Sequence, residues 1–251
     1  MKAGAWRGWV VPLLLLLAAE WAMRTQHVPN DALAAPSASL KSLLAQAADG
    51  TLWTATGQTL GSAFGGLLIG GGPGLLLGLW FGLAPRVANA GALSVELLRP
   101  LPSVALIPVS MLAFGFGFRM EMAVVAFTCL WPMLLLTQAA VRQVEPRLLE
   151  VGRVLRLSPV AQTLKLVLPA AAPRIFVAFR LSVGVALVVA VTVEIAANPQ
   201  GLGYGMISAQ QALMPEQMFA LLVWTGLIGW AASAGLAALE RRLFAHVEAR
   251  R

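Results

Sequence analysis

The stretch from Glu145 to Pro173, EPRLLEVGRVLRLSPVAQTLKLVLPAAAP, combines a helical pattern with strong charge and lies between two long apolar runs. A charge placed at the centre of a bilayer costs at least about 2.5–3.5 kcal/mol. We therefore predict that this stretch lies outside the membrane, on the cytoplasmic side, between two membrane-spanning helices. Its basic residues, with those beside it, are Arg142, Arg147, Arg153, Arg156, Lys165 and Arg174.

The composition of the whole chain is that of an integral membrane protein. Of its 251 residues, 59% are hydrophobic and 12% are charged, and the mean hydropathy is +0.78. Soluble domains are roughly 45–50% apolar and about 25% charged. The net charge of +7 comes from basic residues between the apolar runs, which indicates membrane orientation rather than a nucleic-acid partner. The single cysteine, Cys129, excludes a disulfide framework and a zinc cluster.

Six apolar runs predict an all-α, polytopic protein with six transmembrane helices. The first run also resembles a cleavable signal peptide, with a cleavage site at Ala32-Leu33-Ala34, although its length favours a retained span. Residues 87–99 are ambiguous, residues 40–48 are expected to form an amphipathic piece, and residues 198–217 a glycine-rich outside loop. The predicted spans are 6–23, 57–83, 103–118, 122–141, 175–197 and 218–239.

Glycines of the second predicted span recur every four residues, at 57, 61 and 65 and again at 66, 70, 74 and 78. Such ridges let helix backbones approach closely. They are also a weak dimer signal, but we interpret them as packing within the chain. The stretch Gly70-Gly71-Gly72-Pro73 is expected to kink or loosen the helix midway.

The distribution of basic residues predicts the orientation and the domain organisation. Of the 18 Lys and Arg residues, Arg24, Lys41 and Arg119 fall on segments expected outside. Because positive residues accumulate on the cytoplasmic side, both termini are predicted to be cytoplasmic. We divide the chain into an N-terminal helix with its outside loop (1–53), a transmembrane core (54–245) that contains the charged stretch (145–173), and a basic cytoplasmic tail (246–251).

Within the charged stretch the pattern predicts two short amphipathic helices joined by a sharp turn. Pro146 suits the first position of the first helix. Ser158 followed by Pro159 is typical of a second helix start, with serine as the N-cap. Leu168-Pro169 is expected to end that second helix.

At this point the chain resembles a known family. Glu150-Val151-Gly152, with Leu168-Pro169 eighteen residues later, resembles the EAA loop of ABC-importer permeases. Residues 74–85, 99–108 and 201–204 resemble the aliphatic sulfonate, taurine and nitrate branch, and the likeness covers about residues 55–245. The resemblance implies the type I importer permease fold and a coupling helix that docks on a separate ATPase subunit. It assigns this coupling role to Glu150, Val151, Gly152, Arg153, Arg156, Leu168 and Pro169.

The same resemblance implies partners and a location. A substrate-binding protein, periplasmic or lipid-anchored, would deliver a small anion such as a sulfonate, taurine or nitrate. Two copies of the permease would form a homodimer in the bacterial inner membrane. ATP and Mg would be bound by the partner ATPase, so the chain itself would need no cofactor.

Two positions depart from the family pattern. Gly152 replaces an alanine, and Arg156 stands where the family has a glycine. If the latter position requires positive φ, an arginine there costs about 1–2 kcal/mol. The substitution therefore favours a differently built turn and puts the docking geometry, but not the role of the loop, in question.

Catalysis by this chain is not expected. A Walker A loop needs Gly-Lys-Ser/Thr, and none of Lys2, Lys41 and Lys165 follows a glycine. His27 and His246 fall near opposite ends, so neither a catalytic set nor a metal site is predicted. The chain is interpreted as a transport subunit without its own ATPase motifs.

Three residues are candidates for the translocation path. Glu194 near the outer end of the fifth span is either a gate residue or a helix-end acid bonded to nearby backbone or to the glycine-rich loop. Arg180 either snorkels to the cytoplasmic interface or attracts anions at the inner mouth. Tyr204 lies among glycines that either allow turns or meet the binding protein.

Other functions stay open as alternatives. An ion-coupled secondary transporter of a small solute would need acidic or broken-helix sites near the bilayer midplane. The same importer type could instead carry a pyrimidine-like or other organic substrate. A structural scaffold is a third possibility that the sequence does not exclude.

Overall fold

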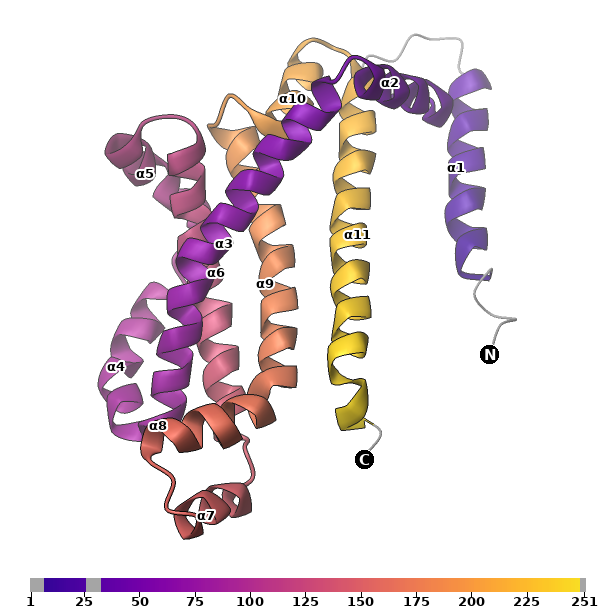
Figure 1. Ribbon diagram of the computed structural model, residues 1–251. Helices are drawn as coiled ribbons and strands as arrows, with labels where there is room; N and C mark the ends of the chain where they lie inside the picture. The colour runs from indigo at the N-terminus through magenta and orange to yellow at the C-terminus, as the bar shows by residue number, and fades with distance from the viewer. Residues whose placement is uncertain (1–6, 26–32, 249–251) are drawn as a thin grey trace.

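The computed structural model describes residues 7–25 and 33–248, and within these ranges the protein is built from helices without strands (Figure 1). The all-α prediction is thus confirmed. The start of the first apolar run, Ala32 of the proposed cleavage site and the last residues of the basic tail lie outside the described ranges. The helices are α1 (Arg7–Thr25), α2 (Pro36–Ala48), α3 (Thr51–Leu83), α4 (Pro85–Leu98), η1 (Ser103–Leu106), α5 (Ile107–Phe114), α6 (Phe118–Arg142), α7 (Pro146–Val154), α8 (Pro159–Gln162), η2 (Thr163–Val167), α9 (Leu168–Ala196), α10 (Gly201–Gln211) and α11 (Pro215–Glu248).

Helices α3 and α6 make the most extensive contact between two helices of the described chain, and the glycines of α3 explain why. A Cβ at Gly70 would lie 1.8 Å from the carbonyl oxygen of Ala126, and one at Gly74 would lie 2.6 Å from that of Leu130. Only hydrogen atoms fit between the two backbones at these positions. The interpretation of the ridge as packing within the chain is confirmed. The stretch Gly70-Gly71-Gly72-Pro73, expected to kink or loosen this helix, does not interrupt it, because α3 runs through Pro73 as one continuous helix.

Helix α9 completes a three-helix core with α3 and α6. Small side chains dominate the contact, so the three backbones lie close together along their middle turns. The free thiol of Cys129 is buried there and donates a weak hydrogen bond to the carbonyl of Ser182, 3.7 Å away. The buried residues of this core are Ala63, Leu67, Val125, Cys129, Val183, Ala186 and Ala190.

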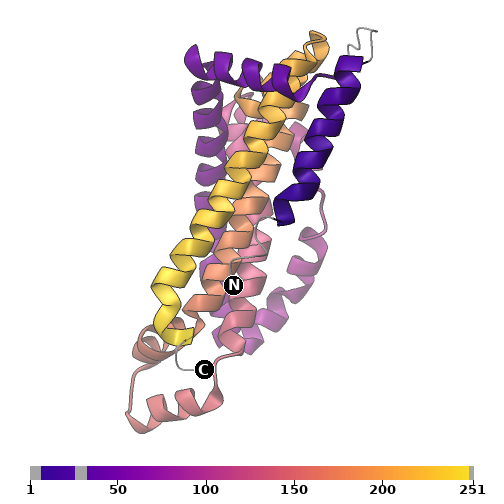
Figure 2. The same cartoon turned by 90° about the vertical axis from the view of Figure 1, so that its right-hand side faces the viewer.

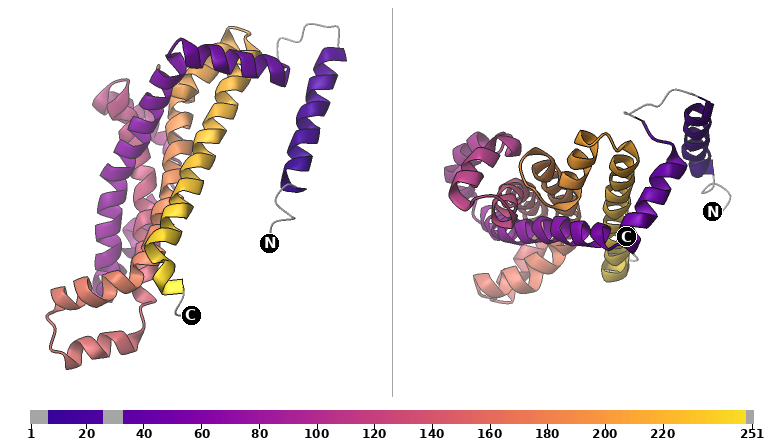
Figure 3. Two further views of the ribbon diagram at one scale, coloured as in Figure 1. Left: turned by 45° about the vertical axis from the view of Figure 1, so that its right-hand side comes forward. Right: turned by 90° about the horizontal axis from the view of Figure 1, so that it is seen from above.

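Helix α11 lies beside α9, and the amphipathic α2 lies across one end of the bundle (Figure 2). At that end, Leu52 of α3 packs with Leu202 and Met206 of α10 and with Leu221 of α11. The expected amphipathic piece at 40–48 is therefore part of a helix that covers this end. The other end carries α7, α8 and η2, which project beyond the bundle (Figure 3).

Among the described residues, four helices are long and apolar enough to cross a membrane, or five when a bent pair counts as one span. The four are α3, α6, the continuous helix from Pro159 to Ala196, and α11. The predicted third span is corrected: Ser103–Phe114 spans only with α4, to which it is bent by 85°. Pro100 and Pro102 separate the two, since proline cannot donate to a helix ladder. Within α1 the apolar stretch Leu14–Met23 is shorter than a full span.

Two further expectations from the sequence were wrong. Leu168-Pro169 does not end a helix, because α8 continues through a π-helical turn (η2) into α9. Pro169 follows the π-helical turn directly, and such local adjustments let a helix continue through a residue that has no N–H. The outside segment 198–217 is not an open loop but contains α10. Glycine lets α10 approach α9, since a Cβ at Gly203 would lie 2.4 Å from the carbonyl oxygen of Val191.

Candidate functional site

The charged stretch forms the helical pair that its sequence predicts at both helix starts. Pro146 occupies the first turn of α7. At the second start, the Ser158 hydroxyl accepts a hydrogen bond from the Ala161 N–H at 3.2 Å, and Pro159 follows it at the first position. This is N-capping, which satisfies one of the free N–H groups at a helix start. The predicted start of the second helix is confirmed.

The turn between the two helices is built around Arg156, which has a φ of 49°. The Leu157 N–H donates to the Gly152 carbonyl and the Arg156 N–H donates to the Arg153 carbonyl, both at 3.0 Å. These two bonds define a Schellman motif, whose left-handed residue is usually glycine. Arg156 therefore adopts the conformation that a glycine would adopt, and the expectation of a differently built turn was wrong.

Gly152 fixes the distance between α7 and the second helix. It is buried, and a Cβ added there would lie 2.9 Å from Leu166 and 3.1 Å from Gln162. The Gln162 side-chain amide donates to the Leu149 carbonyl at 2.9 Å and joins the same two elements. The close approach at Gly152 and the Gln162–Leu149 hydrogen bond thus fix α7 against the second helix.

The outer surface of this pair is both charged and apolar. Glu150 and Arg153 are exposed on α7. Val154 is 81% exposed and Val160 on α8 is 68% exposed, and Val151, Leu155 and Leu164 are exposed as well. Exposed apolar side chains on a segment that lies beyond the bundle are typical of a surface that contacts another protein. We call these five apolar residues, with Glu150 and Arg153, the α7–α8 surface.

The structure does not gather all seven residues assigned to coupling. Glu150, Val151, Gly152, Arg153 and Arg156 lie together on α7 and its turn. Leu168 and Pro169 belong to the first turn of α9, on the bundle side of the π-helical segment. Their place suggests that they direct the second helix into α9 rather than forming part of the α7–α8 surface.

A second polar site is buried at the opposite end, between α3, α6, α9 and α10. Glu194 is 1% exposed and accepts hydrogen bonds from the Thr59 hydroxyl at 2.7 Å and from the Gly203 N–H at 2.8 Å. Thr59 in turn accepts from the Leu202 N–H at 2.9 Å. Glu194 thus connects α9 to α3 and to the start of α10.

The same buried cluster contains a second acid, Glu121 in the first turn of α6, which falls between the third and fourth predicted spans. Glu121 is 1% exposed, and Ser62, which bonds it, lies on the same stretch of α3 as Thr59, which bonds Glu194. Glu121 accepts from the Ser62 hydroxyl and, at 2.6 Å, from the Asn198 amide. The sequence offered one local signal: Gly117 directly precedes α6, where the chain has a φ of 110° that favours glycine, and Glu121 lies in the first turn that follows.

The three predicted pathway residues do not form one site. Arg180 and Glu194 are 14 positions apart on α9, which corresponds to ~21 Å. Arg180 forms an ion pair with Glu240 of α11 at 3.0 Å.

Tyr204, 43% exposed, lines a shallow pocket of about 520 Å³ beside α2 and α10. In that pocket, hydrogen bonds from the Thr51 side chain and backbone hold the pKa of Asp49 below its usual value.

Metal binding has no support in this part of the chain. Residues 7–25 and 33–248 contain no group of three or more His, Cys, Asp or Glu side chains that could hold a metal ion. What the arrangement offers is an exposed surface with apolar and charged side chains at one end, two buried carboxyl groups at the other, and helices long enough to span a membrane between them.

Comparison with known proteins agrees with this arrangement. The aliphatic sulfonates transport permease protein SsuC of Bacillus subtilis is 32% identical over 71% of this chain and 64% of its own length. The nitrate import permease protein NrtB of Leptolyngbya laminosa is 27% identical over 65% of this chain and 59% of its own length. The matched region thus covers less than two thirds of these two relatives. The taurine transport system permease protein TauC of Escherichia coli is 28% identical over 92% of this chain and 86% of its length.

A solved structure shares the fold. The inward-facing MetNI methionine ABC transporter matches with a TM-score of 0.57 at 19% identity, over 74% of this chain and 93% of that one. This likeness shows a type I permease fold. Residues 74–248 match the family described as "Binding-protein-dependent transport system inner membrane component". Because that match covers more than half of the sequence, the chain belongs to this family of membrane-spanning transport components.

Proposed function

We propose that the chain is the permease subunit of an ATP-driven importer and that the α7–α8 surface receives the ATPase. The observation that carries the proposal is the group of exposed apolar side chains, with Glu150 and Arg153, on a rigid helical pair outside the bundle. An apolar centre with charged residues around it is typical of protein interfaces. The ATPase would bind ATP and Mg, and this chain would convert its movement into a change of helix packing.

The rigidity of the helical pair supports this role. Gly152, Gln162 and the Schellman turn fix α7 against the second helix. That helix continues through η2 into α9, so a force on the α7–α8 surface reaches the three-helix core without a flexible joint. In this proposal two copies of the chain form the pathway and alternate between outward-open and inward-open states.

The proposed substrate is a small anion. The relatives are named for aliphatic sulfonates, nitrate, taurine and bicarbonate, which are small solutes and mostly anions. A binding protein would deliver the anion at the end formed by α2 and α10, where Tyr204 lines the shallow pocket. The proposed orientation in the bacterial inner membrane therefore places α7 and α8 in the cytoplasm and α10 outside.

Co-purification with the cognate ATPase tests the proposal. The tagged, detergent-solubilised chain should recover one ATPase per permease. Glu150→Lys should abolish this recovery, because it reverses a charge in the α7–α8 surface. Glu216→Lys, an equal change at an exposed glutamate of α11 at the opposite end, should leave it intact.

Two outcomes would count against the proposal. If the ATPase bound the Glu150→Lys protein normally, the α7–α8 surface would not be its docking site. If the chain purified alone even after crosslinking in membranes, the importer proposal would fail. Transport abolished by an uncoupler would then support an ion-coupled transporter that uses the buried pair of Glu121 and Glu194.

A further inference from the structure

A cluster of buried polar side chains gathers two acids at the end of the bundle that carries α10. Glu121 and Glu194 are each 1% exposed. Ser62 bonds Glu121, and Thr59 bonds Glu194. These two α3 residues are three positions apart and so share one face of the helix. Asn198, which also bonds Glu121, follows Glu194 by four positions. The two carboxyl groups therefore belong to one site.

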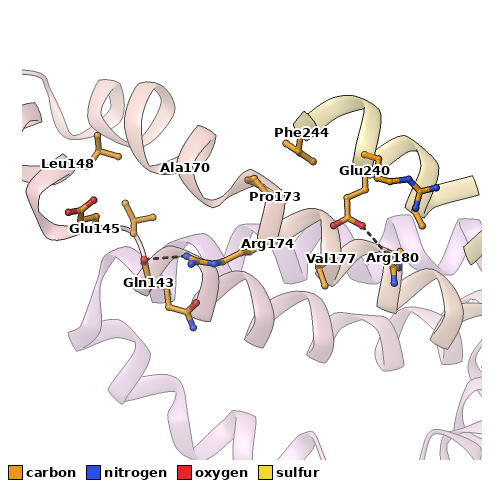
Figure 4. A pocket seen from close by; sticks show the side chains of 13 residues that line it. Gln143, Glu145, Leu148, Ala170, Pro173, Arg174, Val177, Arg180, Glu240 and Phe244 are labelled. Carbon is orange, nitrogen blue, oxygen red and sulfur yellow. Dashed lines mark hydrogen bonds and ion pairs between the residues drawn. The ribbon is translucent and has the colours of Figure 1, made fainter. Parts of the chain in front are cut away.

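The elements packed around these acids bring no positive charge to them. Helices α3, α10, η1 and α5 contain no Asp, Glu, Lys, Arg or His, and the titratable side chain of α10 is Tyr204, which is 43% exposed. On α6, Arg119 is exposed, and within the described ranges it makes no ion pair with either acid. On α9 the nearest arginine is Arg180, 14 positions from Glu194, where it pairs with Glu240 of α11 (Figure 4). Two ionised carboxylates in one buried site without a counter-charge are strongly unfavourable, so one of the two acids should be neutral.

The hydrogen bonds around Glu194 favour its ionised form. One of its oxygens accepts from the Gly203 N–H at 2.8 Å, and a backbone N–H can only donate. The other contacts the Thr59 hydroxyl at 2.7 Å, whose oxygen already accepts from the Leu202 N–H. The hydroxyl hydrogen is then available to Glu194, because the alternative acceptor, the Ala55 carbonyl, is more distant at 3.1 Å. Leu202 and Gly203 belong to the first turn of α10, where free N–H groups and the helix dipole favour a negative charge.

The groups around Glu121 can instead accept a hydrogen bond from it. The bond between Ser62 and Glu121 can run in either direction, because the Ser62 hydroxyl can give its own hydrogen to the Thr59 carbonyl at 3.0 Å. Asn198 is 1% exposed, and its amide contacts the other oxygen of Glu121 at 2.6 Å. The Oδ1 atom of this amide is buried and has no hydrogen-bond partner in the described part of the chain. A carboxyl O–H on Glu121 would supply a donor to such acceptors.

We propose that this cluster is a proton-binding site in which Glu121 carries the proton and Glu194 is the carboxylate. The Glu121 O–H donates to the Ser62 oxygen or to the Asn198 Oδ1, while Gly203 and Thr59 hold the charge of Glu194. The neutral form of Glu121 lets α6 pack on α3 and α9 without repulsion between the two acids. Release of the proton would place two negative charges where α3, α6, α9 and α10 meet, and would loosen this end of the bundle.

Infrared spectroscopy of the detergent-solubilised chain at neutral pH tests this assignment, because a neutral carboxyl group has a C=O stretching band that a carboxylate lacks. The band should be present in the unsubstituted protein, absent in Glu121→Gln and retained in Glu194→Gln. Glutamine has the shape of a neutral glutamic acid, so Glu121→Gln should unfold at the temperature of the unsubstituted protein. It should also remove the fall in unfolding temperature that the unsubstituted protein shows as the pH rises, since a proton bound in the folded state stabilises it less as protons become scarce.

Glu216→Gln is the matched control, because Glu216 is an exposed glutamate of α11, and it should change neither the band nor the pH profile. Absence of the band from the unsubstituted protein would show that both acids are ionised. A band that survives Glu121→Gln, or that disappears in Glu194→Gln, would place the proton on the other acid. Either result would overturn the proposal, and so would a much lower unfolding temperature of Glu121→Gln at neutral pH. The chain is measured without ATPase or binding protein, so the result does not bear on the docking role of the α7–α8 surface.

Discussion

At the scale of single residues, Arg156 is the position where sequence and backbone conflict. Its φ of 49° lies in the left-handed region, which costs a side-chain-bearing residue about 1–2 kcal/mol. Arg156→Gly should remove this cost and stabilise the turn by about 1 kcal/mol, after the greater flexibility of glycine in the unfolded chain is included. Hydrogen exchange should show slower exchange of the Leu157 amide, which donates to Gly152.

The same substitution three residues earlier serves as the comparison for Arg156. Arg153 lies within α7, where glycine is less favourable than arginine by somewhat under 1 kcal/mol. Arg153→Gly should therefore speed exchange of the amides in α7. Faster exchange in both variants would show that the turn tolerates arginine without strain.

Thr59 is the residue on which the buried carboxyl cluster depends. Its hydroxyl contacts Glu194 at 2.7 Å and accepts from the Leu202 N–H at 2.9 Å. Thr59→Val keeps the shape but leaves both buried groups without this partner, at about 1–3 kcal/mol for each unsatisfied group. Thermal unfolding in detergent should begin several degrees lower.

Thr128→Val gives the reference for that loss. The Thr128 hydroxyl is bonded to the Val124 carbonyl of its own helix and is only partly buried, so its removal should change stability little. Equal unfolding temperatures for the Thr59→Val and Thr128→Val proteins would show that the carboxyl cluster does not hold α3, α9 and α10 together.

These residues also show what the sequence could reveal locally. The Ser158 cap could be predicted, because its partner Ala161 is three residues away and the Ser-Pro pair is a local signal. The buried position of Glu121 could not be predicted, because its partners Ser62 and Asn198 lie 59 and 77 residues away in the sequence. Only the packing of α3 and α9 on α6 brings these partners to Glu121. The sequence identified Arg156 as a departure from the family pattern, but it did not predict the left-handed conformation. That conformation belongs to a turn in which the Leu157 N–H donates to the Gly152 carbonyl.

At the scale of elements, the contact of α3 with α6 is the feature most sensitive to a single methyl group. A Cβ at Gly70 would lie 1.8 Å from the Ala126 carbonyl oxygen, so Gly70→Ala must push the two helices apart. We expect a loss of about 1–3 kcal/mol or more, the usual range for overpacking. Detergent unfolding and recovery of folded protein on gel filtration measure it.

Gly72 supplies the control on the same helix. A Cβ at Gly72 meets nothing within 4 Å, so Gly72→Ala should leave stability unchanged or raise it through the better helix propensity of alanine. If Gly70→Ala unfolded at the same temperature as Gly72→Ala, the backbones of α3 and α6 would not be in the contact described here.

Helices were predicted well where a local sequence pattern marks them, and poorly where contacts with distant parts of the chain determine their course. The four-residue glycine spacing was enough to predict the close face of α3. The helix α10 was missed because its glycines suggested a loop, whereas Gly203 is needed for the approach to α9. The bent pair of α4 and α5 was missed because Pro100 and Pro102 indicate a break but not the angle of 85° at which the chain returns.

At the scale of the whole molecule, two separate signals in the sequence predict membrane insertion and orientation. Apolar length predicts the spans and basic residues predict the side. The limits of the third span were wrong, since Ser103–Phe114 was counted as a span of its own and reaches that length only together with α4. The predicted orientation does not change, because a bent pair that begins at Pro85 and ends before α6 still carries the chain from one end of the bundle to the other (Figure 1).

The orientation can be tested directly, because the native thiol of Cys129 is fully buried and should not react. Val154→Cys places an exposed thiol on the α7–α8 surface, and Leu213→Cys places one at the opposite end, where Leu213 is 64% exposed. A membrane-impermeant maleimide should label Leu213→Cys in intact cells and Val154→Cys only in inverted membrane vesicles. The unsubstituted protein should be unlabelled in both. The reverse pattern would place the α7–α8 surface outside, away from any cytoplasmic ATPase, and would contradict both the orientation and the docking role that depends on it.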